Sequence, residues 1–194
     1  MFFCRVKKQF CNNGSYDGGE ADKKNRVSVK IIHFYLEYSD FQCPACKYGS
    51  NQVKRLQSEY GEKITFYYKH YPLKQHKWAD DAAFFTSCVN DTFGQEAFWK
   101  SHDLIFDNQD QFNEPSFNEV VNRVFMSEVK FNYSSCLDKS EKYKKFVKSS
   151  VDEGVGIGIR STPTFIVEGH IVPGADYKKI KEANQICLLY TSPS

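Results

Sequence analysis

Two cysteines separated by two residues, Cys43 and Cys46, are the residues of this chain whose type and spacing most directly suggest chemistry. The reactive form of cysteine is the thiolate, which free N–H groups and the dipole stabilise at a helix N-terminus. An apolar stretch ends in Ser39-Asp40 just before the pair, and a helical pattern runs on from Cys46. The spacing therefore predicts an exposed, activated Cys43 at a helix N-terminus and a shielded Cys46 that can form a disulfide with it.

The segments on either side of the pair have the pattern of a strand–helix–strand unit. Residues 27–38 are β-branched, aromatic and apolar on both faces, as in a central strand that is covered on both sides. The helix is expected to run to about Tyr60 and to end at Gly61, before a strand over residues 64–71. This order within ~45 residues predicts two parallel strands joined by the helix.

Helical patterns then follow without an intervening strand, over about residues 75–156. Each has apolar residues at steps of three and four, which is typical of a helix that buries one face, and the last is expected to end at Gly154. These helices predict an inserted helical module. The patterns begin near Trp78, Phe98, Phe117 and Tyr143.

The α/β pattern resumes after the helical module. Short strands are expected at residues 164–168 and 171–173, around a hairpin turn at Gly169-His170, and a helix is expected from Ala175. This return to strands after the helices indicates one α/β unit that the helical module interrupts.

Both ends of the chain differ from the middle. Residues 1–26 lack the apolar segment of a signal peptide and are expected to form a flexible N-terminal segment. Residues 187–194, CLLYTSPS, look like a translated sequencing-library adapter and are expected to be a non-native tail. The folded domain is therefore expected to span residues 27–186.

Composition argues against several classes of function. Of the 194 residues 41% are hydrophobic, enough for a packed core, and 26 basic and 24 acidic residues leave a net charge of +2. This balance gives no case for nucleic acid or an anionic membrane as a partner. No segment approaches the ~18 apolar residues of a membrane span.

A structural zinc half-site is the main alternative for the cysteine pair. Zinc would need two further ligands close by, and neither the other cysteines nor His70 and His76 supply a ligand pair at a recognised spacing. We therefore expect no metal, and no cofactor other than a redox-active disulfide between Cys43 and Cys46.

Three motifs, EYSDFQCPAC, YYKHYPL and STPTFIVEGHIVPGA, resemble the DsbA-like thioredoxin family, and the resemblance extends from about Val29 to Asn184. It implies an α/β thioredoxin fold with an inserted helical domain, and thiol–disulfide exchange as the activity. It also implies that Cys43 is the attacking cysteine and Cys46 the resolving one. Pro44-Ala45 stands where the strongest oxidants have Pro-His, so a pKa intermediate between those of strong oxidants and of thioredoxin is expected for Cys43.

The same resemblance assigns a substrate site beside the cysteines. Pro163 would be a cis-proline, preceded by Thr162, whereas the alternative is an ordinary turn before a strand. A proline there removes an N–H group and opens a backbone edge to which an extended substrate can add. Thr162, Pro44 and Ala45 are therefore expected to contact the substrate.

A buried acid is a further feature that the resemblance implies. Glu37 falls where the family keeps such an acid, and Lys69 on the neighbouring strand is its expected basic partner in a proton relay to Cys46. The alternative for Glu37 is a solvated carboxylate at the end of a strand.

Cys88 and Cys136 both lie in the predicted helical module. Cys88 is next to an apolar stripe and Cys136 is between two helical patterns, so a structural disulfide is expected, and the resemblance is compatible with it. The alternative is two buried free thiols, which behave as small hydrophobic groups.

The function expected from these features is that of a disulfide-forming oxidase that acts on reduced, unfolded, exported proteins. It would be a bacterial, monomeric, periplasmic or cell-surface protein that a separate redox partner recycles. The alternatives are a thiol reductase or isomerase of the same fold, and a non-catalytic module that binds metal or peptide.

Overall fold

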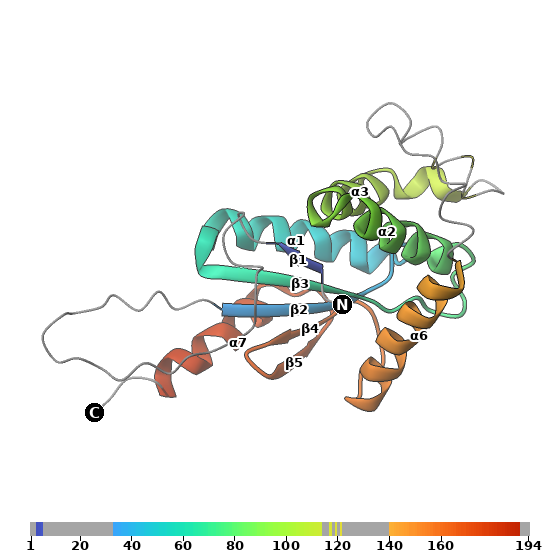
Figure 1. Cartoon of the computed structure of the whole chain (residues 1–194). Coiled ribbons are helices and arrows are strands. Elements are labelled where there is room, and N and C mark those ends of the chain that lie inside the picture. The colour runs from blue at the N-terminus through green and yellow to red at the C-terminus, as the bar shows by residue number, and fades with distance from the viewer. Residues whose placement is uncertain are drawn as a thin grey trace, which may run out of the picture.

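The computed structural model describes residues 3–5, 33–113, 117, 119, 121 and 140–190. A five-stranded sheet of order β1-β3-β2-β4-β5 lies at its centre (Figure 1). β2 and β3 are parallel, as expected, and the other neighbouring strands are antiparallel. The strands are β1 (Phe3–Arg5), β2 (His33–Ser39), β3 (Ile64–His70), β4 (Thr164–Val167) and β5 (His170–Pro173).

The helices follow the order expected from the sequence. α1 begins directly after Cys43 and ends at Gly61, whose φ of 57° suits a glycine. The helices are α1 (Pro44–Tyr60), α2 (Ala79–Phe93), α3 (Gln95–Asp107), α6 (Ser140–Gly156) and α7 (Tyr177–Tyr190), with short 3₁₀ helices η1 (Gly61–Lys63) and η2 (Gln109–Asn113). None of the described helices is long and apolar enough to cross a membrane.

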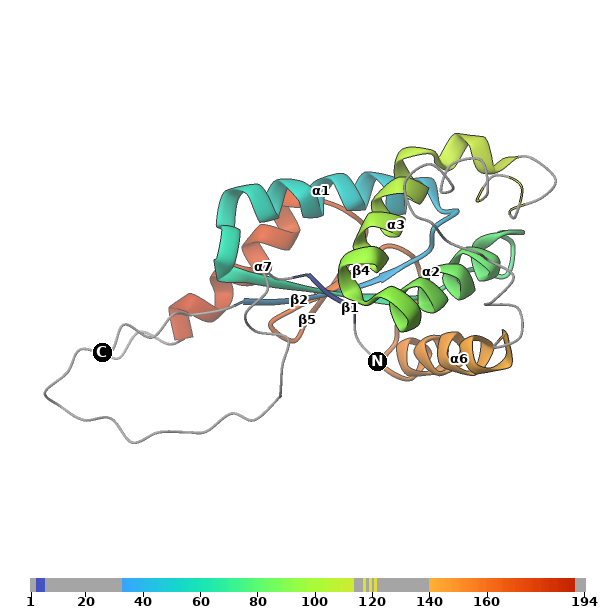
Figure 2. The same cartoon turned by 45° about the horizontal axis from the view of Figure 1, so that its top comes forward.

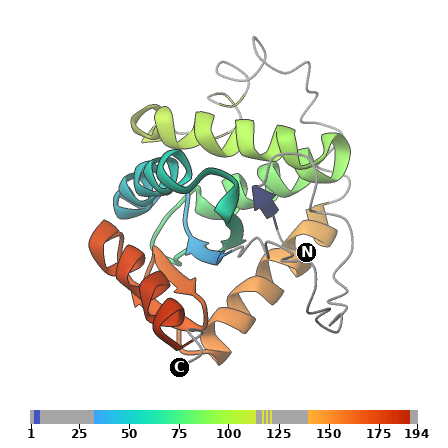
Figure 3. The ribbon, with the colours of Figure 1, turned by 90° about the vertical axis from the view of Figure 1, so that its left-hand side faces the viewer.

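The sheet is covered on both faces. α1 and α7 pack on one face, where Leu56 and Ile180 meet Tyr35 and Phe66. α6 packs on the other face, where its Val151 meets a cluster around Tyr38. Figure 3 shows α1 and α7 on one side of the sheet and α6 on the opposite side. Burial on both faces explains why β2 and β3 carry aromatic or aliphatic residues on each of their faces.

The segment between β3 and β4 forms the expected helical module, with α2, α3 and α6 gathered at the end of the molecule away from α7 (Figure 2). α3 also covers the sheet, because the rings of Phe98 and Trp99 contact Tyr68 of β3. Of the third predicted helix, Phe117 and Val121 are helical and buried, and most of the rest lies outside the described residues.

Gly154 does not end the last helix of the module, contrary to the sequence prediction, because α6 continues to Gly156. A β-carbon added at Gly154 would lie 2.7 Å from Cε2 of Tyr71 and 3.0 Å from Cε1 of Tyr38. The glycine therefore serves close packing of α6 on the sheet rather than helix termination.

Two further details differ from the sequence prediction. Residues 3–5, expected to be flexible, form β1, which pairs with the edge of β3; so short a strand has no periodicity to detect. The hairpin turn is Glu168-Gly169 rather than Gly169-His170, because Val167 pairs with His170. Both turn residues have positive φ, 48° at Glu168 and 84° at Gly169, as a two-residue type I′ hairpin turn requires.

Candidate active site

Cys43 and Cys46 lie where β2 leads into α1, and both thiols are free in this structure. Cys43 is the N-cap residue of α1, and its carbonyl accepts hydrogen bonds from the amides of Cys46 (3.0 Å) and Lys47 (3.2 Å). Cys46 points inward and is fully buried. Cys43 is only 8% exposed, so the expectation of an exposed thiol is wrong, although Cys43 is the more accessible of the pair. Its sulfur lies against the carbonyl of Thr162, at 3.5 Å.

The surroundings of the two sulfurs shift the pKa values of the two thiols in opposite directions. A hydrogen bond with the Cys46 side chain is the main cause that lowers the pKa of Cys43 to about 5, and burial opposes this effect. Burial, followed by the interaction with Cys43, raises the pKa of Cys46 well above its ordinary value. At neutral pH Cys43 is therefore a thiolate and Cys46 a thiol, which fits an attacking and a resolving cysteine.

The proposed substrate residues surround Cys43. The peptide bond between Thr162 and Pro163 is cis, and the carbonyl of Thr162 lies 3.5 Å from the sulfur of Cys43, where it can accept a hydrogen bond only from the protonated thiol. Pro163 packs on α1 at Gly49, where an added β-carbon would lie 3.2 Å from the Cγ of the proline. Pro44 and Ala45 are exposed in the first turn of α1. The fold therefore brings these residues, far apart in sequence, to one end of the sheet.

Glu37 is buried in β2, 3% exposed, so a solvated strand end is the wrong interpretation. It pairs in register with Tyr68 and so lies on the sheet face that α1 and α3 cover. Its Oε1 has no hydrogen-bond partner among the described residues. Burial raises the pKa of Glu37 to about 7, and the charge of Glu37 contributes to the raised pKa of Cys46. The carboxyl group is thus poised to take up and release protons near neutral pH.

Lys69 is not the partner of Glu37, contrary to the sequence prediction. Lys69 pairs in register with Tyr38, one position beyond Glu37, and side chains alternate between the two faces of a sheet. Its ammonium group instead contacts the carboxylate of Glu153 in α6 at 2.7 Å, and the Tyr38 hydroxyl donates to the same carboxylate at 2.8 Å. This ion pair fastens α6 to the opposite face of the sheet.

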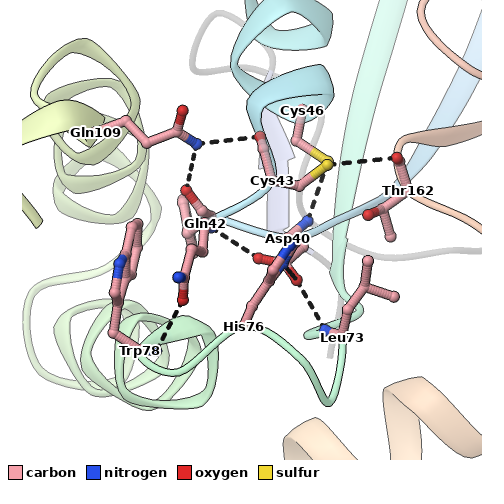
Figure 4. A network of polar contacts seen from close by, with 10 residues as sticks. Asp40, Gln42, Cys43, Cys46, Leu73, His76, Trp78, Gln109 and Thr162 are labelled. Atoms are coloured by element: carbon pink, nitrogen blue, oxygen red, sulfur yellow. Dashed lines mark hydrogen bonds and ion pairs between the residues drawn. The ribbon is translucent and has the colours of Figure 1, made fainter. Parts of the chain in front are cut away.

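A polar network around Asp40 was missed in the sequence analysis (Figure 4). The buried carboxylate of Asp40 accepts hydrogen bonds from the amides of Gln42 and Leu73 and is paired with Nδ1 of His76, each at 2.7 Å. The amide group of Gln109 in η2 donates to the carbonyls of Phe41 (2.7 Å) and Cys43 (3.1 Å). These contacts fix residues 40–43 from two other segments of the chain. The single signal in the sequence was a polar pair, Ser39-Asp40, which ends three residues before Cys43.

Of the two cysteines expected to form a structural disulfide, only Cys88 lies among the described residues. Cys88 is buried in α2 and is disulfide-bonded, so it is not a free thiol. Cys136 lies outside the described residues, and its pairing with Cys88 stays a prediction.

The raised pKa of Glu37 predicts a specific dependence of stability on pH. Between the ordinary pKa of 4.5 and the folded value of about 7, the native state keeps a proton that the unfolded state releases. The contribution of Glu37 to stability should therefore fall as the pH rises through this window, by up to about 3 kcal/mol. In the reduced protein the lowered pKa of Cys43 acts in the opposite direction, so the effect of Glu37 is the difference between the wild type and Glu37→Gln. Glu37→Gln should become more stable relative to the wild type between about pH 5 and about pH 8, which urea unfolding of both proteins would measure. Glu182→Gln, at an exposed carboxylate of α7, should follow the pH dependence of the wild type; a Glu37→Gln variant that also follows it would contradict the assignment.

Comparisons with known proteins agree with this fold. A family model described as Thioredoxin matches residues 29–184. Over 176 residues the chain is 24% identical to a protein named "Probable disulfide bond formation protein D" from Bacillus anthracis, covering 87% of this chain and 78% of that protein. The crystal structure of oxidised BdbD from Bacillus subtilis superposes with a TM-score of 0.69 at 21% identity, covering 81% of this chain and 88% of that one.

A second group of relatives is much longer than this chain. Over 135 residues the chain is 27% identical to "Na(+)/H(+) antiporter NhaA 3" of Salinispora tropica. The match covers 69% of this chain but only 20% of the antiporter. The family model covers most of the chain, and the Cys43–Cys46 pair sits where β2 meets α1. The chain therefore belongs to the thioredoxin family, has the fold of its DsbA-like members, and carries a CxxC site suited to thiol–disulfide exchange.

Proposed function

We propose that the protein is a thiol:disulfide oxidoreductase that forms disulfides in reduced, unfolded, exported proteins. The observation that carries this proposal is the opposite shift of the two thiols, with the pKa of Cys43 lowered to about 5 and that of Cys46 raised. A stabilised Cys43 thiolate stabilises the reduced enzyme, and a couple with a stable reduced form is a strong oxidant.

The reaction transfers two electrons from two substrate thiols to the enzyme disulfide. A substrate thiolate attacks the sulfur of Cys43, the bond between Cys43 and Cys46 breaks, and Cys46 leaves. A second substrate thiolate then attacks the substrate sulfur of this mixed disulfide and releases Cys43 as a thiolate. The product is a substrate disulfide and a reduced enzyme, which a separate redox partner must reoxidise.

Cys46 is the poor leaving group of this pair, because its buried thiolate is strongly disfavoured. We assign Glu37 as the acid that supplies the proton which Cys46 takes up as it leaves, and as the base in the reverse step. A carboxyl group whose pKa is about 7 can act in both directions near neutral pH. Lys69 has no part in this relay, because it lies on the other face of the sheet and is paired with Glu153.

The substrate would lie along the backbone at Thr162 and Pro163. Pro163 offers no N–H group, and Pro44 and Ala45 present an exposed surface beside Cys43. An extended segment could pair with this edge while its cysteine reaches Cys43. The similarity to a protein named for disulfide bond formation supports protein thiols as the substrate. We also propose that the protein is extracytoplasmic and monomeric.

The redox potential of the pair distinguishes an oxidase from the reductase alternative. We expect equilibration with glutathione buffers to give a potential between about −120 and −180 mV, the range from strong oxidants to isomerases. The measurement is the fraction of reduced Cys43 and Cys46 at each buffer ratio, read by alkylation and mass spectrometry. A potential near about −270 mV would instead identify a reductase.

A non-catalytic metal-binding module is the other alternative. Within the part of the chain that the structure describes, no group of three or more His, Cys, Asp or Glu residues could hold a metal ion. Stoichiometric metal in the purified protein, together with no oxidation of a reduced substrate, would favour that alternative.

A further inference from the structure

Asp40 differs from the other residues of the site in that it contacts both cysteines through its backbone. Its amide N–H donates to the sulfur of Cys46 at 3.4 Å, and its carbonyl accepts the amide of Cys43 at 3.1 Å. It is 1% exposed, and its position decides where these two backbone groups lie relative to the sulfurs.

The side chain of Asp40 is anchored to a different part of the fold. Its Oδ2 accepts the amide of Leu73 and lies 2.7 Å from Nδ1 of His76, both in the segment between β3 and α2. Its Oδ1 accepts the amide of Gln42 at 2.7 Å, which closes a tight turn before the helix. A buried carboxylate with these partners is held firmly, because any movement would leave polar groups without partners.

We propose that Asp40, anchored by His76, is a positioning residue that holds its amide against the sulfur of Cys46 and thereby sets the reactivity of Cys43. A hydrogen bond from an N–H group to the sulfur of a thiol polarises the S–H group of that thiol, and hydrogen bonds that follow one another in a chain strengthen one another. The Cys46 thiol then becomes a better donor to the Cys43 thiolate, which is the interaction that most stabilises this thiolate. The inference rests on the exchange activity of the same pair but not on its direction.

Other contacts keep the same segment folded when this anchor is lost. Gln109 still holds the carbonyls of Phe41 and Cys43, and the side chain of Gln42 still accepts the amide of Trp78 at 2.8 Å. Substitution of Asp40 should therefore shift the amide away from Cys46 without unfolding the protein. The ionisable groups near the Asp40 carboxylate are His76, Asp80 at the start of α2, and the buried Tyr68. Tyr68 in turn interacts with the buried Glu37 and with Cys46.

Asp40→Asn tests the anchor, because one amide oxygen cannot replace the acceptors of a carboxylate. We expect the pKa of Cys43, from thiolate absorbance and alkylation rate against pH, to rise by about 0.5 to 1. The equilibrium constant with glutathione should change about three- to tenfold in the less oxidising direction. Asp80→Asn is the matched control, since it removes a nearby exposed carboxylate that has no part in the anchor, and should leave both values unchanged.

His76 provides a second, independent test. His76→Ala should raise the pKa of Cys43 in the same direction, whereas His76→Gln, which keeps an N–H donor, should stay near the wild type. A folded Asp40→Asn protein with an unchanged Cys43 pKa would overturn the proposal. If Asp40→Asn does not fold, an unchanged pKa in His76→Ala overturns it instead. Because these measurements read the thiol itself, they are separate from whether the protein proves to be an oxidase.

Discussion

Replacing Cys43 with serine is expected to abolish thiol–disulfide exchange, with a loss of at least about 10³-fold in the oxidation of a reduced, unfolded substrate. A serine hydroxyl is not ionised at neutral pH and cannot form a disulfide with either the substrate or Cys46. The structure makes Cys43 the thiolate of the pair and the one that solvent can reach. The measurement is the rate of disulfide formation in the substrate under a fixed oxidant.

Cys46→Ala is the informative comparison for this variant. It leaves the Cys43 thiolate, which can attack a substrate that already contains a disulfide, but removes the thiol that would resolve the product. Mixed disulfides between the enzyme and such an oxidised substrate should therefore accumulate on non-reducing gels. Cys43→Ser should form none of these complexes. Complexes in Cys43→Ser and none in Cys46→Ala would reverse the assignment of the two cysteines.

Substituting Gly154 with alanine is expected to cause a large loss of stability, because Gly154 is the described glycine at which an added β-carbon makes the shortest contact. The added carbon would overlap the rings of Tyr71 and Tyr38. Neither ring is free to move, because the Tyr71 hydroxyl donates to the carbonyl of Ile159 at 3.0 Å and the Tyr38 hydroxyl donates to Glu153. Overpacking of this kind costs about 2 to 3 kcal/mol, or about 5 to 10 °C in Tm for a protein of this size.

Gly156→Ala is the matched control two residues further along the same helix. Nothing lies within 4 Å of a β-carbon at Gly156, which is exposed. Alanine is the better helix former, so this change should be neutral or stabilising by up to about 1 kcal/mol. Thermal and denaturant unfolding of both variants would give the two values. Equal effects would mean that helix propensity, rather than contact with the two rings, governs Gly154.

The sequence alone was sufficient to predict that the cysteine pair lies between a strand and the N-terminus of a helix. Cys43 lies at a helix N-terminus because the residues directly before and after it form a strand and a helix, and these preferences are local. The end of α1 at Gly61 and the helical module between β3 and β4 could be predicted for the same reason. Periodicity and helix-ending residues are properties of neighbouring positions, so they can be read without knowing the fold.

The partners of polar side chains were decided by the tertiary structure. Glu37 and Lys69 lie on neighbouring strands, but the register places them on opposite faces, and register depends on how whole strands pair. In the sequence Gly154 is predicted to end a helix. In the structure it instead allows α6 to pack closely against the rings of Tyr38 on β2 and Tyr71 after β3.

The surroundings of the cysteines show the same division. The sequence supplies a thiol pair with one member on the inward face of a helix, and this already separates an attacking from a buried sulfur. The anchor of Asp40 on Leu73 and His76, and the contact of Gln109 with Cys43, join segments more than 30 positions apart. Hydrogen bonds between such distant segments form only when packing of the helical module against the sheet brings them together, so no local pattern in the chain encodes them.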